Sequence, residues 1–174
     1  ALAAAEAFGD ADGGLYVWDA ASGEELLSWS GHDSDITRVR WSPREPLLAS
    51  SDDDGLIYIW LADSEETEQK LQTLAGHTNT VADLSWSPDG KKLASAGHDQ
   101  TARIWDVDNG TELMTLDDQS DLVSAVAWSP NGRLLASGGW DHAIHLWNPE
   151  TGERLQKLEK HVYAVVSLAW SSDG

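Results

Sequence analysis

Short apolar segments alternate with polar turns along the chain, and this pattern predicts β-strands. Four segments are apolar at nearly every position, as expected of strands covered on both faces: residues 36–41 (ITRVRW), 81–86 (VADLSW), 123–128 (VSAVAW) and 165–170 (VVSLAW). Turn chemistry follows two of them at once, with SPDG at 87–90 and SPNG at 129–132. No segment has a convincing helical period. The pattern therefore predicts an all-β chain of antiparallel strands.

The tryptophans mark a repeat. Eight of the 10 fall into two registers, each with a spacing of 42 or 45 residues: Trp41, Trp86, Trp128 and Trp170 in one, and Trp18, Trp60, Trp105 and Trp147 in the other. Self-similarity at such a period indicates a supersecondary unit stacked on copies of itself, because one copy cannot bury its own hydrophobic faces. Each unit is predicted to contain four short strands.

This repeat resembles the WD-repeat family of β-propellers. The family's opening dipeptide GH stands at 31–32 and 76–77, and its closing dipeptide WD at 18–19 and 105–106. The third and fourth repeats open with Asp118-Gln119 and Lys160-His161, and two repeats close with Trp60-Leu61 and Trp147-Asn148. The resemblance implies one domain over residues 1–174, made of four circularly permuted blades. One blade is split, with a C-terminal strand from 161–174 and N-terminal strands from 1–30.

In this family a histidine, a serine or threonine, a turn aspartate and a tryptophan form a buried hydrogen-bond network that locks each blade. The residue types fit, because an indole N–H only donates, a carboxylate only accepts, and a hydroxyl and an imidazole relay between them. The third repeat has Gln119 in place of histidine, so its network is expected to be incomplete. The serine, histidine and aspartate also form a nominal hydrolase triad, but the set recurs with a tryptophan attached, which favours a structural role. The matching positions are His32, Ser50, Asp54 and Trp60; His77, Ser95, Asp99 and Trp105; Ser137, Asp141 and Trp147; and Asp12 and Trp18.

Composition narrows the possible partners. Thirty acidic against 11 basic residues give a net charge of -19, which argues against nucleic acid and anionic lipid and favours cationic partners. No apolar run approaches the roughly 20 residues of a membrane span. The chain has no cysteine and no intact signal peptide, which suggests a cytoplasmic protein.

The sequence predicts neither a metal nor a cofactor. His142 and His145 lie three apart on an expected strand and therefore point to opposite faces. The segments GDADGG at 9–14 and SDDDG at 51–55 lack the spacing of a calcium loop. No glycine-rich loop precedes a helix, as a phosphate site would require.

Four blades of this type should form an arc rather than a ring, and an arc exposes two apolar blade faces. A homodimer that closes an eight-bladed ring, with each split blade completed by the other copy, is the simplest way to cover them. A piece of a longer propeller and a closed four-bladed monomer are the alternatives. The regular repeats and abrupt ends also make an engineered origin credible.

The function expected from these features is a non-enzymatic scaffold for protein–protein interaction, in the form of a self-assembling half-propeller. The family's peptide-docking rim would here carry exposed aromatic and acidic side chains suited to a basic peptide. The alternative is a propeller-based enzyme built around Asp83, an acidic residue inside an expected innermost strand. The rim positions are Trp140, Tyr163, His98, Asp33, Asp35, Asp52 and Asp53.

Overall fold

The computed structural model describes residues 2–5, 13–62 and 70–174. All the regular secondary structure within these ranges consists of β-strands, so the all-β prediction is confirmed. The described part of the chain holds no helix that could cross a membrane.

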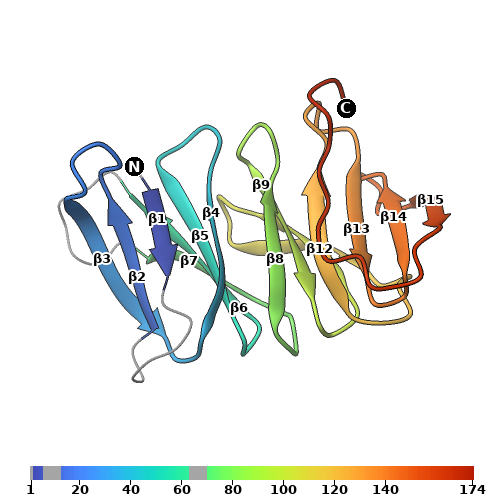
Figure 1. The fold of residues 1–174 in the computed structure, drawn as a ribbon, viewed down its shortest axis with the longest axis horizontal. Coiled ribbons are helices and arrows are strands. Elements are labelled where there is room, and N and C mark those ends of the chain that lie inside the picture. Colours follow the sequence, from blue (N-terminus) through green and yellow to red (C-terminus); the bar gives the residue numbers. More distant parts are fainter. Residues whose placement is uncertain (1, 6–12, 63–69) are drawn as a thin grey trace.

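The strands form four antiparallel sheets, each in chain order (Figure 1). Three of the sheets have four strands each, as predicted for propeller blades, whereas the first sheet has three. The sheets are β1 (Leu2–Ala5), β2 (Gly13–Trp18) and β3 (Glu25–His32); β4 (Ile36–Trp41), β5 (Leu47–Asp52), β6 (Leu56–Leu61) and β7 (Lys70–Ala75); β8 (Val81–Trp86), β9 (Lys92–Gly97), β10 (Ala102–Asp106) and β11 (Thr111–Leu116); and β12 (Val123–Trp128), β13 (Leu135–Gly139), β14 (Ala143–Trp147) and β15 (Arg154–Glu159).

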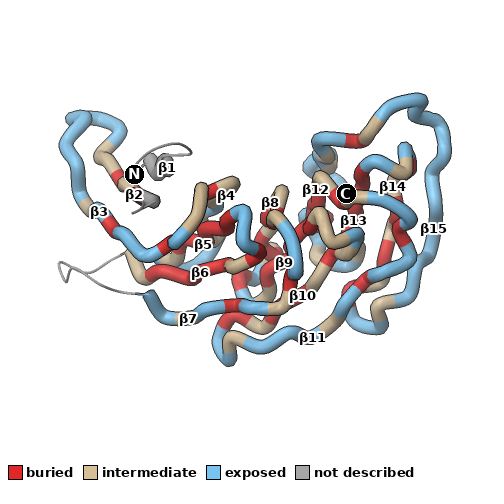
Figure 2. The backbone as a smooth tube through the Cα atoms, turned by 90° about the horizontal axis from the view of Figure 1, so that it is seen from below, coloured by how far each residue is buried: buried red, intermediate tan, exposed pale blue. Residues whose placement is uncertain are grey.

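The buried clusters combine residues from neighbouring sheets, and Figure 2 shows the buried residues in red along the backbone. At the middle contact, Ile57, Ile59 and Leu74 from one sheet pack with Trp86 and Trp105 of the next. Equivalent clusters fill the other two contacts. Both tryptophan registers therefore serve one purpose, which is to fill the space against the preceding blade. This explains why tryptophan recurs at the blade period.

Each outer strand carries a β-bulge at a leucine. The pairing of each third strand with its outer strand shifts beside the second-register tryptophan, which leaves one leucine unpaired and exposed. A bulge twists an edge strand and hinders edge-to-edge pairing with another sheet. The outer edges are therefore poor templates for aggregation. The bulged residues are Leu26, Leu71, Leu113 and Leu155.

The four sheets form an open arc with β1–β3 at one end and β12–β15 at the other (Figure 1). The strand predicted within 161–174 is not formed: residues 164–170 are extended but pair with no neighbour as a strand. They lie instead along β12, where Val165 N donates to Gly139 O at 2.9 Å and Trp170 Nε1 donates to Ala127 O at 3.0 Å. The sheet that the split-blade prediction pairs with this segment lies at the far end of the arc, so the strand stays a prediction for the assembled ring.

Candidate functional site

The sheet β8–β11 contains the full predicted network. Trp105 Nε1 donates to Ser95 Oγ at 2.8 Å, and the Ser95 hydroxyl and His77 Nε2 are 2.7 Å apart. His77 Nδ1 lies 2.9 Å from Asp99 Oδ2. With the Nδ1 proton donated to the carboxylate, Nε2 accepts from the hydroxyl, so every member is satisfied. The network therefore connects the loop before the innermost strand to the second and third strands of the blade.

Asp99 is the charged end of that network. Its burial, the largest single influence, would raise the pKa of the carboxyl, but hydrogen bonds from His77, Thr101 and the Thr78 amide outweigh it and hold the pKa far below its ordinary value. The carboxylate is therefore ionised in the folded protein at any pH near neutral.

In the sheet β4–β7 the predicted aspartate was wrong. Asp52, not Asp54, lies 2.7 Å from His32 Nδ1, while Asp54 is exposed. His32 Nε2 and Trp60 Nε1 both meet Ser50 Oγ, at 2.6 and 2.8 Å. The network is thus complete, but its carboxylate comes from a different residue.

The reason lies in one glycine. Asp52 follows its network serine by two positions, and the residue at that position in the next blade is Gly97. A Cβ at Gly97 would collide with both His77 Nδ1 and Asp99 Oδ1. A side chain at this position therefore excludes the usual aspartate, and Asp52 supplies the carboxylate itself. The sequence signal that could have predicted the exchange is the aspartate at position 52, where the next blade has Gly97.

The network in the sheet β12–β15 is broken, as expected from Gln119. Trp147 Nε1 donates to Ser137 Oγ at 2.8 Å, and the Ser137 hydroxyl donates to Gln119 Oε1. Asp141 does not join them, because His145 Nε2 lies 2.7 Å from its carboxylate. Gln119 Nε2 and His145 Nδ1 are buried without a partner among the described residues.

The sequence interpretation missed one recurrent position, two residues before the second-register tryptophan. The side chain there contacts the histidine or the aspartate of each complete or broken network. The only hint in the sequence is that it is large and polar in all three blades. The pairs are Tyr58 over His32 with ring centroids 4.3 Å apart, Arg103 with Asp99 at 3.5 Å, and His145 with Asp141.

The split blade is described only in part. Asp12 lies outside the described residues, so its predicted place in a network stays a prediction. Trp18 is half-buried at the end of β2 and stacks on Tyr16, with ring centroids 5.6 Å apart.

Most of the predicted rim residues lie in loops on one edge of the arc. The amides of Asp53, His98 and Trp140 donate to the loop that precedes the innermost strand of the same blade, at Asp35, Thr80 and Leu122. Trp140 is 53% exposed and Tyr163 is 80% exposed, while Asp33 and Asp53 are exposed, and His98 and Asp35 are half-buried. Asp52 does not belong to this rim, since it is buried in the network with His32.

Asp83, the centre of the alternative enzymatic interpretation, is already paired. Arg40 Nη2 lies 2.8 Å and Arg38 Nε 3.5 Å from its Oδ1, and the Val126 amide donates to its Oδ2 at 3.3 Å. Both oxygens of this carboxylate are therefore engaged within the chain. In the described ranges, no three His, Asp or Glu side chains come together as metal ligands would.

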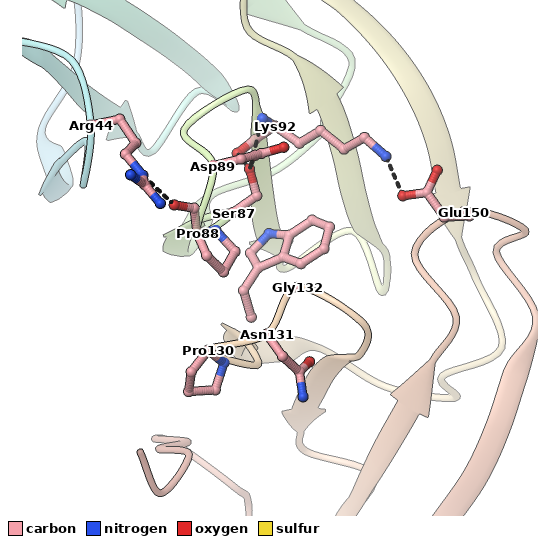
Figure 3. Close-up of a pocket in the computed structure, with 10 residues that line it drawn as sticks. Arg44, Ser87, Pro88, Asp89, Lys92, Pro130, Asn131, Gly132 and Glu150 are labelled. Atoms are coloured by element: carbon pink, nitrogen blue, oxygen red, sulfur yellow. Dashed lines mark hydrogen bonds and ion pairs between the residues drawn. The ribbon is translucent and has the colours of Figure 1, made fainter. Parts of the chain in front are cut away.

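The opposite rim has a shallow pocket between the turns 87–90 and 129–132, with Trp128 at its side (Figure 3). Its charged groups are engaged within the chain: Lys92 Nζ lies 2.6 Å from Glu150 Oε1, and Arg44 Nε donates to Pro88 O at 3.1 Å. Lys92 and Glu150 thus neutralise each other, whereas Arg44 has a neutral carbonyl as its partner and Asp89 accepts from Ser87 Oγ and from the Lys91 amide.

Comparison with known proteins gives the family. Residues 17–173 match the CAF1B/HIR1 beta-propeller domain, and the chain belongs to this family of WD-repeat β-propellers. A chain in the crystal structure of the mitotic checkpoint complex superposes with a TM-score of 0.85 and 32% identity, over 92% of this chain and 49% of that one.

Curated relatives match only one or two blades. The human serine-threonine kinase receptor-associated protein is 46% identical over 52 residues, which is 30% of this chain and 15% of that protein. The Arabidopsis thaliana WD repeat-containing protein 26 homolog is 38% identical over 58 residues, 33% of this chain and 10% of its own length. The matches thus span a small part of these relatives.

The use of Asp52 in place of Asp54 in the β4–β7 network predicts that the two aspartates differ in how much they stabilise the fold. Asp52→Ala leaves the His32 Nδ1 proton and the Leu56 amide without their acceptor, so we expect a loss of about 1–3 kcal/mol in the free energy of unfolding. The matched control, Asp54→Ala, should change it by less than about 0.5 kcal/mol. Urea unfolding of both variants checks this; equal effects would contradict the assignment.

The low pKa of Asp99 predicts a pH dependence. Because the folded pKa lies below the ordinary 3.8, the unfolded chain takes up the proton first as pH falls, and the contribution of this carboxylate is present above about pH 4 and lost below it. The destabilisation caused by Asp99→Asn should therefore be greatest near neutral pH and shrink below pH 4. Unfolding measured from about pH 2 to 7 tests this, and a difference independent of pH would disprove it.

Proposed function

We propose that the chain is a non-enzymatic protein-interaction scaffold, and that its half-propeller is closed into an eight-bladed ring by a second copy. WD-repeat propellers as a class bind proteins, and this supports the scaffold role. One observation supports closure. Blades pack face to face three times within the chain, and the two faces that would form a fourth such contact are left uncovered at the ends of the arc.

The face of the last blade lacks its cover. Leu74 and Leu116 hold equivalent positions near the ends of the outer strands of the two middle blades and are 0% and 2% exposed, because the next blade packs on them. Leu158 holds the same position in β15 and is 42% exposed. Burying a leucine stabilises by about 1.5–3 kcal/mol, and Ile144, the partner of Leu158 in β14, is also incompletely buried.

The face of the first sheet is complementary. Trp60, Trp105 and Trp147 are each at most 3% exposed against the blade before them. Trp18, their counterpart in β2, is only half-buried. An apolar face that ends one copy thus matches a tryptophan-bearing face that begins another, and two head-to-tail contacts around a two-fold axis leave neither face in water.

This chain corresponds to 49% of a chain in the mitotic checkpoint complex, and either a second copy or further blades in a longer chain would supply the remaining length. Attachment to further blades in a longer chain and a closed four-bladed monomer would cover the same faces and are distinguished by mass. A cytoplasmic location stays a prediction from composition.

Closure by a second copy predicts a particle of twice 18.9 kDa in light scattering. Leu158→Glu should weaken this dimer at least tenfold by placing a charge in the covered face. Leu113→Glu is the matched control, since Leu113 is also 42% exposed but lies on an outer bulge away from the contact. A compact monomer, or equal weakening by both variants, would contradict the proposal.

A second candidate function is the binding of a basic peptide at the rim. Two exposed aromatic side chains, Trp140 and Tyr163, lie in adjacent loops, since the Val165 amide donates to Gly139 O. Acidic residues surround the same edge, and a net charge of -19 attracts cations.

This candidate predicts that a Lys/Arg-rich peptide binds at low ionic strength and that its affinity falls as salt rises, because exposed charges are screened. Trp140→Ala should reduce the affinity about tenfold, whereas Leu26→Ala, an exposed outer-strand change, should not. Fluorescence anisotropy with a labelled peptide measures both. Binding that ignores salt and Trp140 would exclude this role.

A further inference from the structure

We infer that residues 164–170 of one copy form the innermost strand of the β1–β3 sheet in the other copy, so that one blade is built from two chains. This inference rests on the proposed ring closure but goes further, because two copies could also pack face to face without exchanging a hydrogen-bonded strand.

The sheet β1–β3 lacks one strand at the inner edge. In each four-stranded blade the second strand pairs with an innermost strand on one side and with a third strand on the other. β1 pairs only with β2 among the described residues, and its pairing of Ala3 with Val17 matches that of Ala49 with Ile59 in β5 and β6. β1 is therefore a second strand whose inner edge is open.

Residues 164–170 already make the contacts of an innermost strand with the blade before them. Trp170 Nε1 donates to Ala127 O, just as Trp86 Nε1 donates to Arg40 O across the preceding blade contact. Val165 is buried against Gly138, where a Cβ would collide with it. What this segment lacks is a second strand to pair with.

Residues 164–170 and the inner edge of the β1–β3 sheet are complementary. The segment contributes a strand without a sheet, and β1–β3 contributes a sheet edge without a strand. Pairing them satisfies backbone N–H and C=O groups on both sides, which an apolar contact alone would not do.

The indole of Trp41, in the blade next to the first sheet, has a matching acceptor position in the second copy, but its unpaired state adds no support because Trp128 is unpaired next to a complete blade. The indoles of Trp86 and Trp170 reach the carbonyl that precedes the tryptophan of the previous innermost strand. The indole N–H of Trp41 is buried with no acceptor among the described residues, a state shared by Trp128. The previous innermost strand for Trp41 is residues 164–170 of the second copy, whose Ala169 carbonyl stands at the matching position.

The register follows from the three complete blades. The residue before the first-register tryptophan is the Cα partner of an alanine in the second strand: Arg40 with Ala49, Ser85 with Ala94, and Ala127 with Ala136. The same rule pairs Ala169 of one copy with Ala3 of the other, and Trp170 with Leu2.

Cysteine cross-linking tests this register, and the chain has no cysteine of its own. The variant Ala3→Cys with Ala169→Cys should give a covalent dimer on oxidation, seen on a non-reducing gel. Ala3→Cys with Leu168→Cys should not, because a shift of one residue turns the side chain to the opposite face. The intramolecular pair Ala127→Cys with Ala136→Cys is the positive control for disulfide formation at this position.

Each outcome decides the inference. A covalent dimer from the in-register pair alone supports it. A dimeric mass without this cross-link, when the positive control forms, overturns strand donation but leaves ring closure intact. A disulfide within one chain shows a four-bladed ring, and a monomer without any cross-link leaves the ends open; both overturn strand donation and closure together.

Discussion

The packing of one blade's face on the next is the interaction on which the rest of the structure depends. No sheet here has a core of its own, since the buried clusters combine leucine and isoleucine from one blade with tryptophan from the following blade. A blade is stable only when both faces are covered. The repeat period, the two tryptophan registers and the exposed ends all follow from this one requirement.

The hydrogen-bond networks add geometry to this packing. Each complete network joins a loop, a second strand and a third strand through one histidine and one serine, and buried polar groups of this kind tolerate little displacement. The residues that resemble the family motif therefore stabilise the blade itself. The surfaces that remain accessible to partners are the rims and the two end faces. The pairing of Asp83 with Arg38 and Arg40 belongs to the same structural use of charge.

Local features of the fold could be predicted from the sequence, because strands, SPDG turns and network residues are set within one repeat. Asp52 could not, since its role depends on a steric conflict in three dimensions that a missing glycine only hints at. The partnership of His145 with Asp141 likewise appears only in three dimensions. The strand predicted at 164–170 depends on a non-local partner: β-structure needs a neighbouring strand, and no pattern within the segment shows where that strand comes from.

If the end faces are covered by a second copy, folding and association are one equilibrium, and the unfolding temperature must depend on protein concentration. The most direct test is therefore the midpoint of thermal unfolding measured over a hundredfold range of concentration. The account predicts that the midpoint rises steadily with concentration. A midpoint independent of concentration would show that a single chain is stable with both faces uncovered or covers them by itself, and would contradict the account.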